Sequence, residues 1–164
     1  MRQKVQQQPS LLSRWIDSAL SKELEGLSEL LDGMPELLDL VVGDLVRSGV
    51  HPNIGRRALS AELVLRALFL KQRNGDTYAE LSFKLADSNS YRTFCRLGLG
   101  EAAPSKSSLQ RNIKSIRAET LEAMNRLILA KADKLGIEKG KKVRVDTTVT
   151  ATNIHRPTDS SLLW

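Results

Sequence analysis

Apolar residues recur at intervals of three and four through the first third of the chain, which is typical of helices that bury one face. This pattern predicts short helices over 11–20 and 22–32 and a longer helix over 35–48. Gly49 and Pro52 then interrupt the periodicity and are expected to end the third helix. The apolar stripe of 35–48 is wide enough either for the core of the domain or for an interface with a second copy.

The middle of the chain predicts three more helices, over 61–74, 78–86 and 89–97. The first is apolar on nearly every side, so we expect it to be central and buried. Thr77 and Glu80 have the spacing of a capping box and should open the second helix. In this region the predicted helices are short and follow one another after tight turns.

Two further helices are predicted over 106–116 and 119–135. On the first, Leu109, Ile113 and Ile116 fall on one side by helical spacing, and polar residues cover another side. That polar face consists of Lys106, Ser107, Gln110, Arg111, Lys114 and Arg117. The residues expected to point inward from the second helix are Leu121, Met124, Leu127, Ile128 and Leu135.

The periodicity changes after residue 142, where apolar and polar residues alternate. This alternation predicts a strand over 143–150, with Asp146 among its polar positions. A single strand is not stable alone in water, so we expect it to begin a sheet whose other strands come from elsewhere. The fold class predicted is therefore mainly α, a helical bundle followed by one C-terminal strand.

Charge divides the chain more sharply than hydrophobicity does. The net charge of the 164 residues is +6, but residues 1–50 hold five Lys and Arg against eight Asp and Glu. Residues 51–164 hold twenty Lys and Arg against eleven Asp and Glu. This excess of positive charge is equally compatible with a polyanionic partner and with an ordinary solvated basic face. We therefore expect acidic helices over 1–52, a basic helical domain over 53–136 and the start of another domain over 137–164.

Several classes of protein are disfavoured by the composition. Cys95 is the only cysteine, so no disulfide forms within the chain, and without a histidine nearby in sequence it is expected to be a small core residue. No apolar run approaches the length of a membrane span, and the first ten residues lack the apolar stretch of a secretory signal. We expect a cytoplasmic protein without a membrane partner.

The short helices of 61–116 resemble a helix-turn-helix DNA-binding region, with 106–116 as the recognition helix. Lys106, Gln110, Arg111 and Lys114 are the expected contacts, since Gln and Arg read base edges and Lys holds phosphates. Arg117 is a further phosphate candidate. Arg56 and Arg57 form a second basic cluster, in a linker where they follow the DNA backbone, enter a minor groove or are simply solvated.

Asp146 is a weak catalytic candidate on its own. Metal-dependent phosphoryl transfer uses two cations held about 3.5–4 Å apart by several oxygen ligands. A single aspartate cannot supply them, and Glu138 and Asp159 do not extend the strand.

Three stretches of the chain, 59–97, 104–129 and 136–164, resemble the N-terminal part of a DDE transposase from a bacterial insertion sequence. The resemblance implies a ribonuclease H-like catalytic domain whose first strand carries the first Asp of an Asp-Asp-Glu triad, and Asp146 in VRVDTTV matches that residue. It implies Mg²⁺ as the cofactor of the full-length enzyme and the terminal inverted repeats of the element as its DNA. Nothing in the chain matches the second Asp or the Glu of the triad, so we expect a truncated chain that binds no Mg²⁺ stably. The resemblance also implies a protein that is associated with the bacterial nucleoid.

Three functions remain open on this basis. The chain is the DNA-binding portion of a transposase, or a stand-alone DNA-binding regulator that inhibits transposition without enzymatic activity, or a helical interaction module for which DNA is irrelevant. A homo-oligomer is compatible with each of the three.

Overall fold

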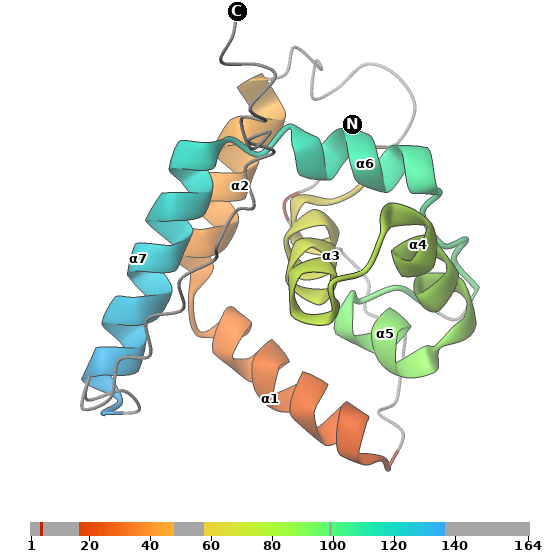
Figure 1. Cartoon of the computed structure of the whole chain (residues 1–164), viewed down its shortest axis with the longest axis horizontal. Coiled ribbons are helices and arrows are strands. Elements are labelled where there is room, and N and C mark those ends of the chain that lie inside the picture. The colour runs from red at the N-terminus through yellow and green to blue at the C-terminus, as the bar shows by residue number, and fades with distance from the viewer. Residues whose placement is uncertain (1–3, 5–16, 48–57, 99, 137–164) are drawn as a thin grey trace, which may run out of the picture.

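Seven helices make up the part of the chain that the computed structural model describes, which is residues 4, 17–47, 58–98 and 100–136. They are α1 (Ala19–Asp32), α2 (Pro35–Arg47), α3 (Ala61–Asn74), α4 (Tyr78–Asp87), α5 (Asn89–Phe94), α6 (Lys106–Lys114) and α7 (Ala118–Lys134) (Figure 1). These residues contain no strand, so the mainly α class is confirmed for them. The strand expected over 143–150 lies outside the described residues.

Local capping explains where the central helices begin and end. The Ser60 hydroxyl accepts a hydrogen bond from the Leu63 amide at 3.2 Å and opens α3. Gly75, with φ of 68°, ends α3 in the left-handed region that favours glycine. Thr77 and Glu80 form the expected capping box at the start of α4.

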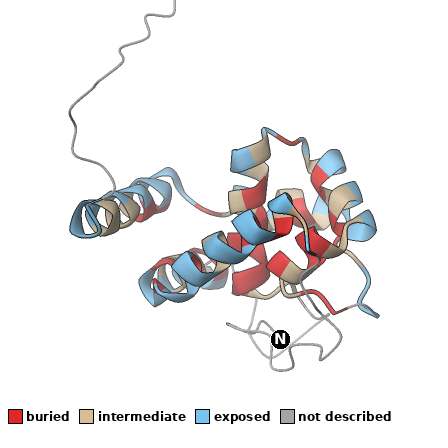
Figure 2. Cartoon of the chain, turned by 90° about the horizontal axis from the view of Figure 1, so that it is seen from below, coloured by how far each residue is buried: buried red, intermediate tan, exposed pale blue. Residues whose placement is uncertain are grey.

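The helix α3 lies at the centre of the molecule, as its apolar sequence predicts. Its residues from Ala61 to Ala67 are all buried. Figure 2 shows that buried positions gather where the helices pack together. The helices α2, α4 and α6 pack around it, while α1 packs on α5 and α2. Two charged residues, Glu62 and Arg66, are buried along with the apolar ones.

The hydrophobic core joins the acidic helices to the basic ones. Leu37, Val41 and Leu45 of α2 are fully buried and belong to the same cluster as the buried residues of α3 to α7. The apolar stripe expected over 35–48 therefore serves the core of the described part. This core crosses the position near residue 52 where composition suggested a boundary between domains.

Two predictions of helix bounds are corrected by the structure. The predicted break between a helix ending at residue 20 and another beginning at residue 22 is not observed. Ser18 caps α1 instead, and this helix runs without interruption from Ala19 to Asp32. The helix expected over 89–97 ends at Phe94, and Arg96 takes the left-handed conformation with φ of 54°. A left-handed residue cannot continue a right-handed helix, so the chain turns there and not at Gly98.

The burial predicted for α7 is wrong at both ends of the helix. Met124 is buried, but Leu121 and Leu135 are 42% and 53% exposed. The helix α7 lies alongside α2 and packs mainly on that one neighbour (Figure 1). A helix with a single neighbour buries a narrow stripe, so apolar residues beside the stripe stay in solvent. Over the described residues, no helix is long and apolar enough to cross a membrane.

Candidate nucleic-acid interface

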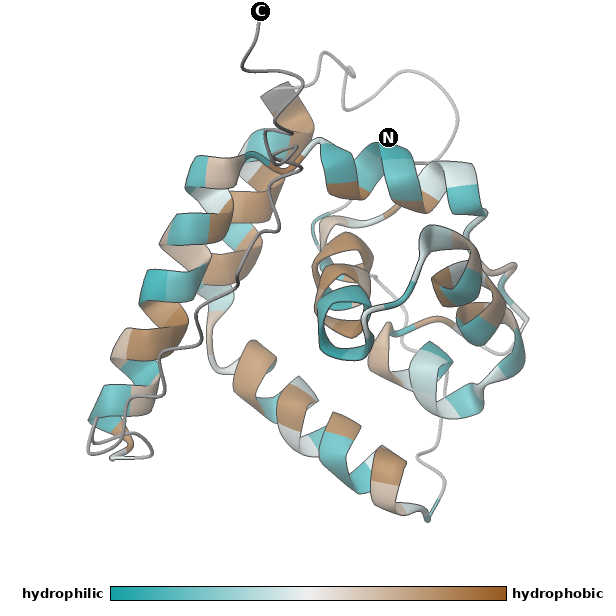
Figure 3. Ribbon diagram, viewed as in Figure 1, coloured by the Kyte–Doolittle hydropathy of each residue, from teal (hydrophilic) through white to brown (hydrophobic). Residues whose placement is uncertain are grey.

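The helix α6 lies across α3 and α4 and is held there by its apolar side. Leu109 and Ile113, with Ile116 just beyond the helix, are buried as predicted. Ser105 caps the first turn by accepting a hydrogen bond from the Ser108 amide at 3.3 Å. Figure 3 shows the resulting contrast, with apolar positions of α6 turned towards α3 and hydrophilic positions turned away.

The opposite side of α6 is basic and open to solvent. Lys106, Ser107, Arg111 and Lys114 are exposed, and Gln110 is half-buried. The helix contains no acidic residue, and none of its three cations forms an ion pair with any residue that the structure describes. Lys106 and Lys114 are eight residues apart, about 12 Å along the helix axis. The structure therefore brings together four of the predicted contacts, Lys106, Gln110, Arg111 and Lys114, as one surface.

Most other arginines near the core are already paired. Arg66 contacts Asp32 at 2.6 Å and Glu62 at 3.3 Å, and Arg96 contacts each of these two carboxylates at 2.7 Å. These four residues come from α1, α3 and the turn after α5. Arg66 also donates a hydrogen bond to the carbonyl oxygen of Phe94 at 3.0 Å. The sequence does not reveal this cluster, because its members are far apart in the chain. A Glu and an Arg four residues apart within the apolar first part of α3 were its one visible signal.

Arg117 is placed differently from the other predicted contacts. It follows the end of α6 and begins α7, and its Nε donates to Asp44 Oδ1 at 2.8 Å. The backbone amide of Arg117 donates to Asp44 Oδ2 at 2.9 Å. Burial by itself would raise the pKa of Asp44, but the bonds from Arg117 and from the Thr120 hydroxyl lower it on balance.

The remaining predicted site residues, Arg56, Arg57 and Asp146, lie outside the described residues. Within the part that the structure does describe, no three His, Cys, Asp or Glu side chains are grouped so that they could hold a metal ion.

Cys95 is a core residue, as predicted. It is fully buried beside the Arg66 cluster, and burial raises the pKa of its thiol to about 12. A thiol with so high a pKa is protonated at neutral pH and is a poor nucleophile. This position therefore offers no covalent chemistry.

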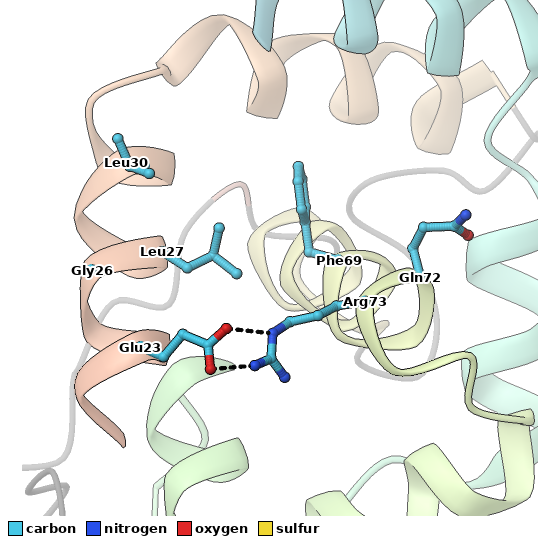
Figure 4. A pocket seen from close by; sticks show the side chains of 7 residues that line it. All are labelled: Glu23, Gly26, Leu27, Leu30, Phe69, Gln72 and Arg73. Atoms are coloured by element: carbon cyan, nitrogen blue, oxygen red, sulfur yellow. Dashed lines mark hydrogen bonds and ion pairs between the residues drawn. The ribbon is translucent and has the colours of Figure 1, made fainter. Parts of the chain in front are cut away.

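An open groove of about 570 Å³ separates α1 from α3 (Figure 4). Leu27, Leu30 and Phe69 give it an apolar lining, and Glu23 and Arg73 pair at one end, with Arg73 Nε 3.2 Å from Glu23 Oε1. Its one carboxylate is engaged by that arginine. The groove has neither the clustered acids nor the nucleophile that catalysis would need, so α6 remains the candidate site.

Comparison with known families assigns most of the described helices to one family. Residues 10–115 match the family described as Transposase domain (DUF772), a stretch that includes α1 to α6. No curated protein and no solved structure matches the chain. Because the match covers more than half of the chain, the protein belongs to the Transposase domain (DUF772) family.

Proposed function

We propose that this chain is the DNA-binding portion of a transposase and that α6 contacts duplex DNA at the ends of an insertion sequence. The observation that carries the proposal is the exposed face of α6, where three cations without acidic partners among the described residues surround a glutamine. Membership of a transposase-domain family makes DNA the polyanion to expect.

The proposed contacts follow from the chemistry of each side chain. An α-helix fits the major groove, where Gln110 and Arg111 would read base edges. Lys106 and Lys114, at the two ends of the face, would neutralise phosphates on either side of the groove. Arg56 and Arg57 are proposed as additional backbone contacts.

We also propose that the transposase is of the DDE type and that Asp146 supplies one carboxylate to a site for two Mg²⁺ ions. One carboxylate cannot hold two ions, so DNA binding is the activity we assign to the 164 residues themselves. Incubation of end DNA with Mg²⁺ separates a cutting enzyme from a regulator that only occupies the ends. We expect binding without cleavage.

The proposal is tested by a salt titration of DNA binding, measured by fluorescence anisotropy of a labelled duplex. For the variant Arg111→Ala/Lys114→Ala we expect affinity to fall by about 100-fold at low salt. The slope of log K against log salt should become shallower by about one, because the phosphate neutralised by Lys114 is lost.

The matched control is Lys131→Ala/Lys134→Ala on α7, which removes the same charge from a helix that we do not place on DNA. Equal losses of DNA affinity in both variants would mean that only the overall charge of the protein matters. Unchanged affinity in the α6 variant would exclude α6 from the interface. Competition between element-end DNA and scrambled DNA then tests specificity. A protein that binds neither DNA would have to be an interaction module.

A further inference from the structure

The joint between α6 and α7 holds one arginine in a defined orientation. Arg117 is the N-cap residue of α7, but its side chain makes no capping hydrogen bond to that helix. Asp44 of α2 instead accepts hydrogen bonds from both the backbone amide and the Nε of Arg117. We propose, on the basis of the DNA-binding function above, that Asp44 is a positioning residue that orients Arg117 as a clamp for a DNA phosphate.

The hydrogen-bond inventory of Arg117 supports this role. A guanidinium carries five N–H donors, and Asp44 accepts a hydrogen bond from the donor on Nε. Among the residues that the structure describes, the two Nη groups form no hydrogen bond, and the guanidinium pairs with no carboxylate other than that of Asp44. The side chain is 52% exposed, so its outer edge faces solvent. Two parallel N–H donors of this kind match a pair of phosphate oxygens.

The position of Arg117 is fixed from the inside. The side chain of Asp44 is only 3% exposed and also bonds to the Thr120 hydroxyl of α7. Ile116, the residue before Arg117, is buried in the core. An arginine already held in place loses less conformational freedom when it binds a phosphate than the free lysines of α6 do.

Arg117 also lies within reach of the proposed interface. Arg117 is the third residue after Lys114, so their Cα atoms are at most about 11 Å apart. The turn that carries Arg117 leaves the end of α6 directly (Figure 1). A DNA backbone that contacts Lys114 could therefore contact Arg117 as well.

The sign of one substitution separates positioning from general electrostatics. Asp44→Asn makes the protein more positive by one charge, which by itself should strengthen DNA binding. If Asp44 positions Arg117, the same substitution weakens binding, because the guanidinium is no longer held. We expect affinity for a duplex of mixed sequence to fall about threefold to tenfold at low salt.

Two variants of Arg117 complete the test. Arg117→Gln should weaken binding about tenfold and make the salt slope shallower by about one. Arg117→Lys keeps the charge but loses the Nε contact, and we expect it to weaken binding nearly as much. In Asp44→Asn/Arg117→Gln the two losses should not add, since the aspartate acts through the arginine. Arg126→Gln on α7 is the matched control for charge and should change affinity less than twofold.

Each result then supports or overturns a distinct statement. If Arg111→Ala/Lys114→Ala weakens binding but Arg117→Gln and Asp44→Asn do not, the clamp is wrong and the proposed function stands. If the α6 variant has no effect, the proposed function itself fails. Circular dichroism checks that each variant is folded. If Asp44→Asn is unfolded, Arg117→Lys decides, and affinity equal to that of the original chain overturns the clamp.

Discussion

The ion-pair cluster around the buried Arg66 and the exposed face of α6 use the same kind of charge in opposite ways. Arg66 and Arg96 lie between Asp32 and Glu62, and Arg66 is 1% exposed. Lys106, Arg111 and Lys114 are exposed and form no ion pair with any described residue. The net charge of +6 therefore does not show where positive charge is free to act. Pairing in the folded chain decides that.

The difference has a physical cause. Removing a charge from water costs several kcal/mol, so a buried cation requires carboxylates and hydrogen bonds around it. Arg66 meets this requirement with Asp32, Glu62 and three further contacts, to the Ser28 hydroxyl, the Phe94 carbonyl and the Phe94 ring. A cation on an exposed helix without acids has no such requirement, and its charge remains free for a polyanion.

The largest effect is expected at the centre of the cluster. Arg66→Ala removes the fully buried cation of the cluster and leaves Glu62 and Asp32 with Arg96 alone, and we expect the free energy of unfolding to fall by about 3–5 kcal/mol. Urea denaturation followed by circular dichroism measures this loss. Arg126→Ala, which removes an exposed and loosely paired arginine, is the control and should change stability by less than about 0.5 kcal/mol. Equal losses would mean that burial does not distinguish the two regions.

A smaller effect is expected at Asp44, which links the core to the α6–α7 turn. Its pKa in the folded protein is lowered from 3.8, so its stabilising contribution is complete above about pH 5 and is lost as the pH falls through the folded value. Asp44→Asn should therefore cost about 2 kcal/mol at pH 7 and progressively less in acid. Unfolding measured from pH 7 to pH 2 tests this, and a cost that stayed constant with pH would contradict it.

The next effect concerns recognition rather than stability. Gln110 is the one uncharged member of the proposed contacts, so Gln110→Ala should leave the salt slope unchanged. It should relax the preference at one base pair by at least about 1 kcal/mol, roughly fivefold. Sequencing of DNA selected from a random library by each protein measures the preference. A changed salt slope would assign Gln110 to the phosphates instead.

The smallest effect is expected at Cys95. Because burial raises the pKa of its thiol to about 12, a thiol reagent should label the folded protein far more slowly than the urea-unfolded chain. Cys95→Ala should bind DNA as the original chain does. Rapid labelling of the folded protein would show that this side of the core opens readily.

Much of the helical pattern was readable in advance, because its signals are local. Ser60, Thr77, Glu80 and Gly75 place the ends of α3 and the start of α4 through contacts with residues nearby in sequence. The predicted face of α6 likewise follows from helical spacing alone. The end of α5 was not predictable, since the left-handed conformation of Arg96 goes with ion pairs to residues 34 and 64 positions away.

Burial was predictable only where a helix has several neighbours. Every residue from 61 to 67 of α3 is enclosed, whichever way the helix is turned. For α7 the pattern shows an apolar stripe but not how much of it a neighbour covers, so the exposure of Leu121 and Leu135 came from the structure.

The sequence by itself determined the helices of this protein, the basic face of α6 and its resemblance to transposases, because helical periodicity and side-chain chemistry are properties of short segments. Only the tertiary structure decided which charges are paired. Asp44 and Arg117 are 73 residues apart, and Asp32 and Arg96 are 64 apart. Such pairs depend on how helices pack, and packing depends on the whole core rather than on any one stretch of sequence.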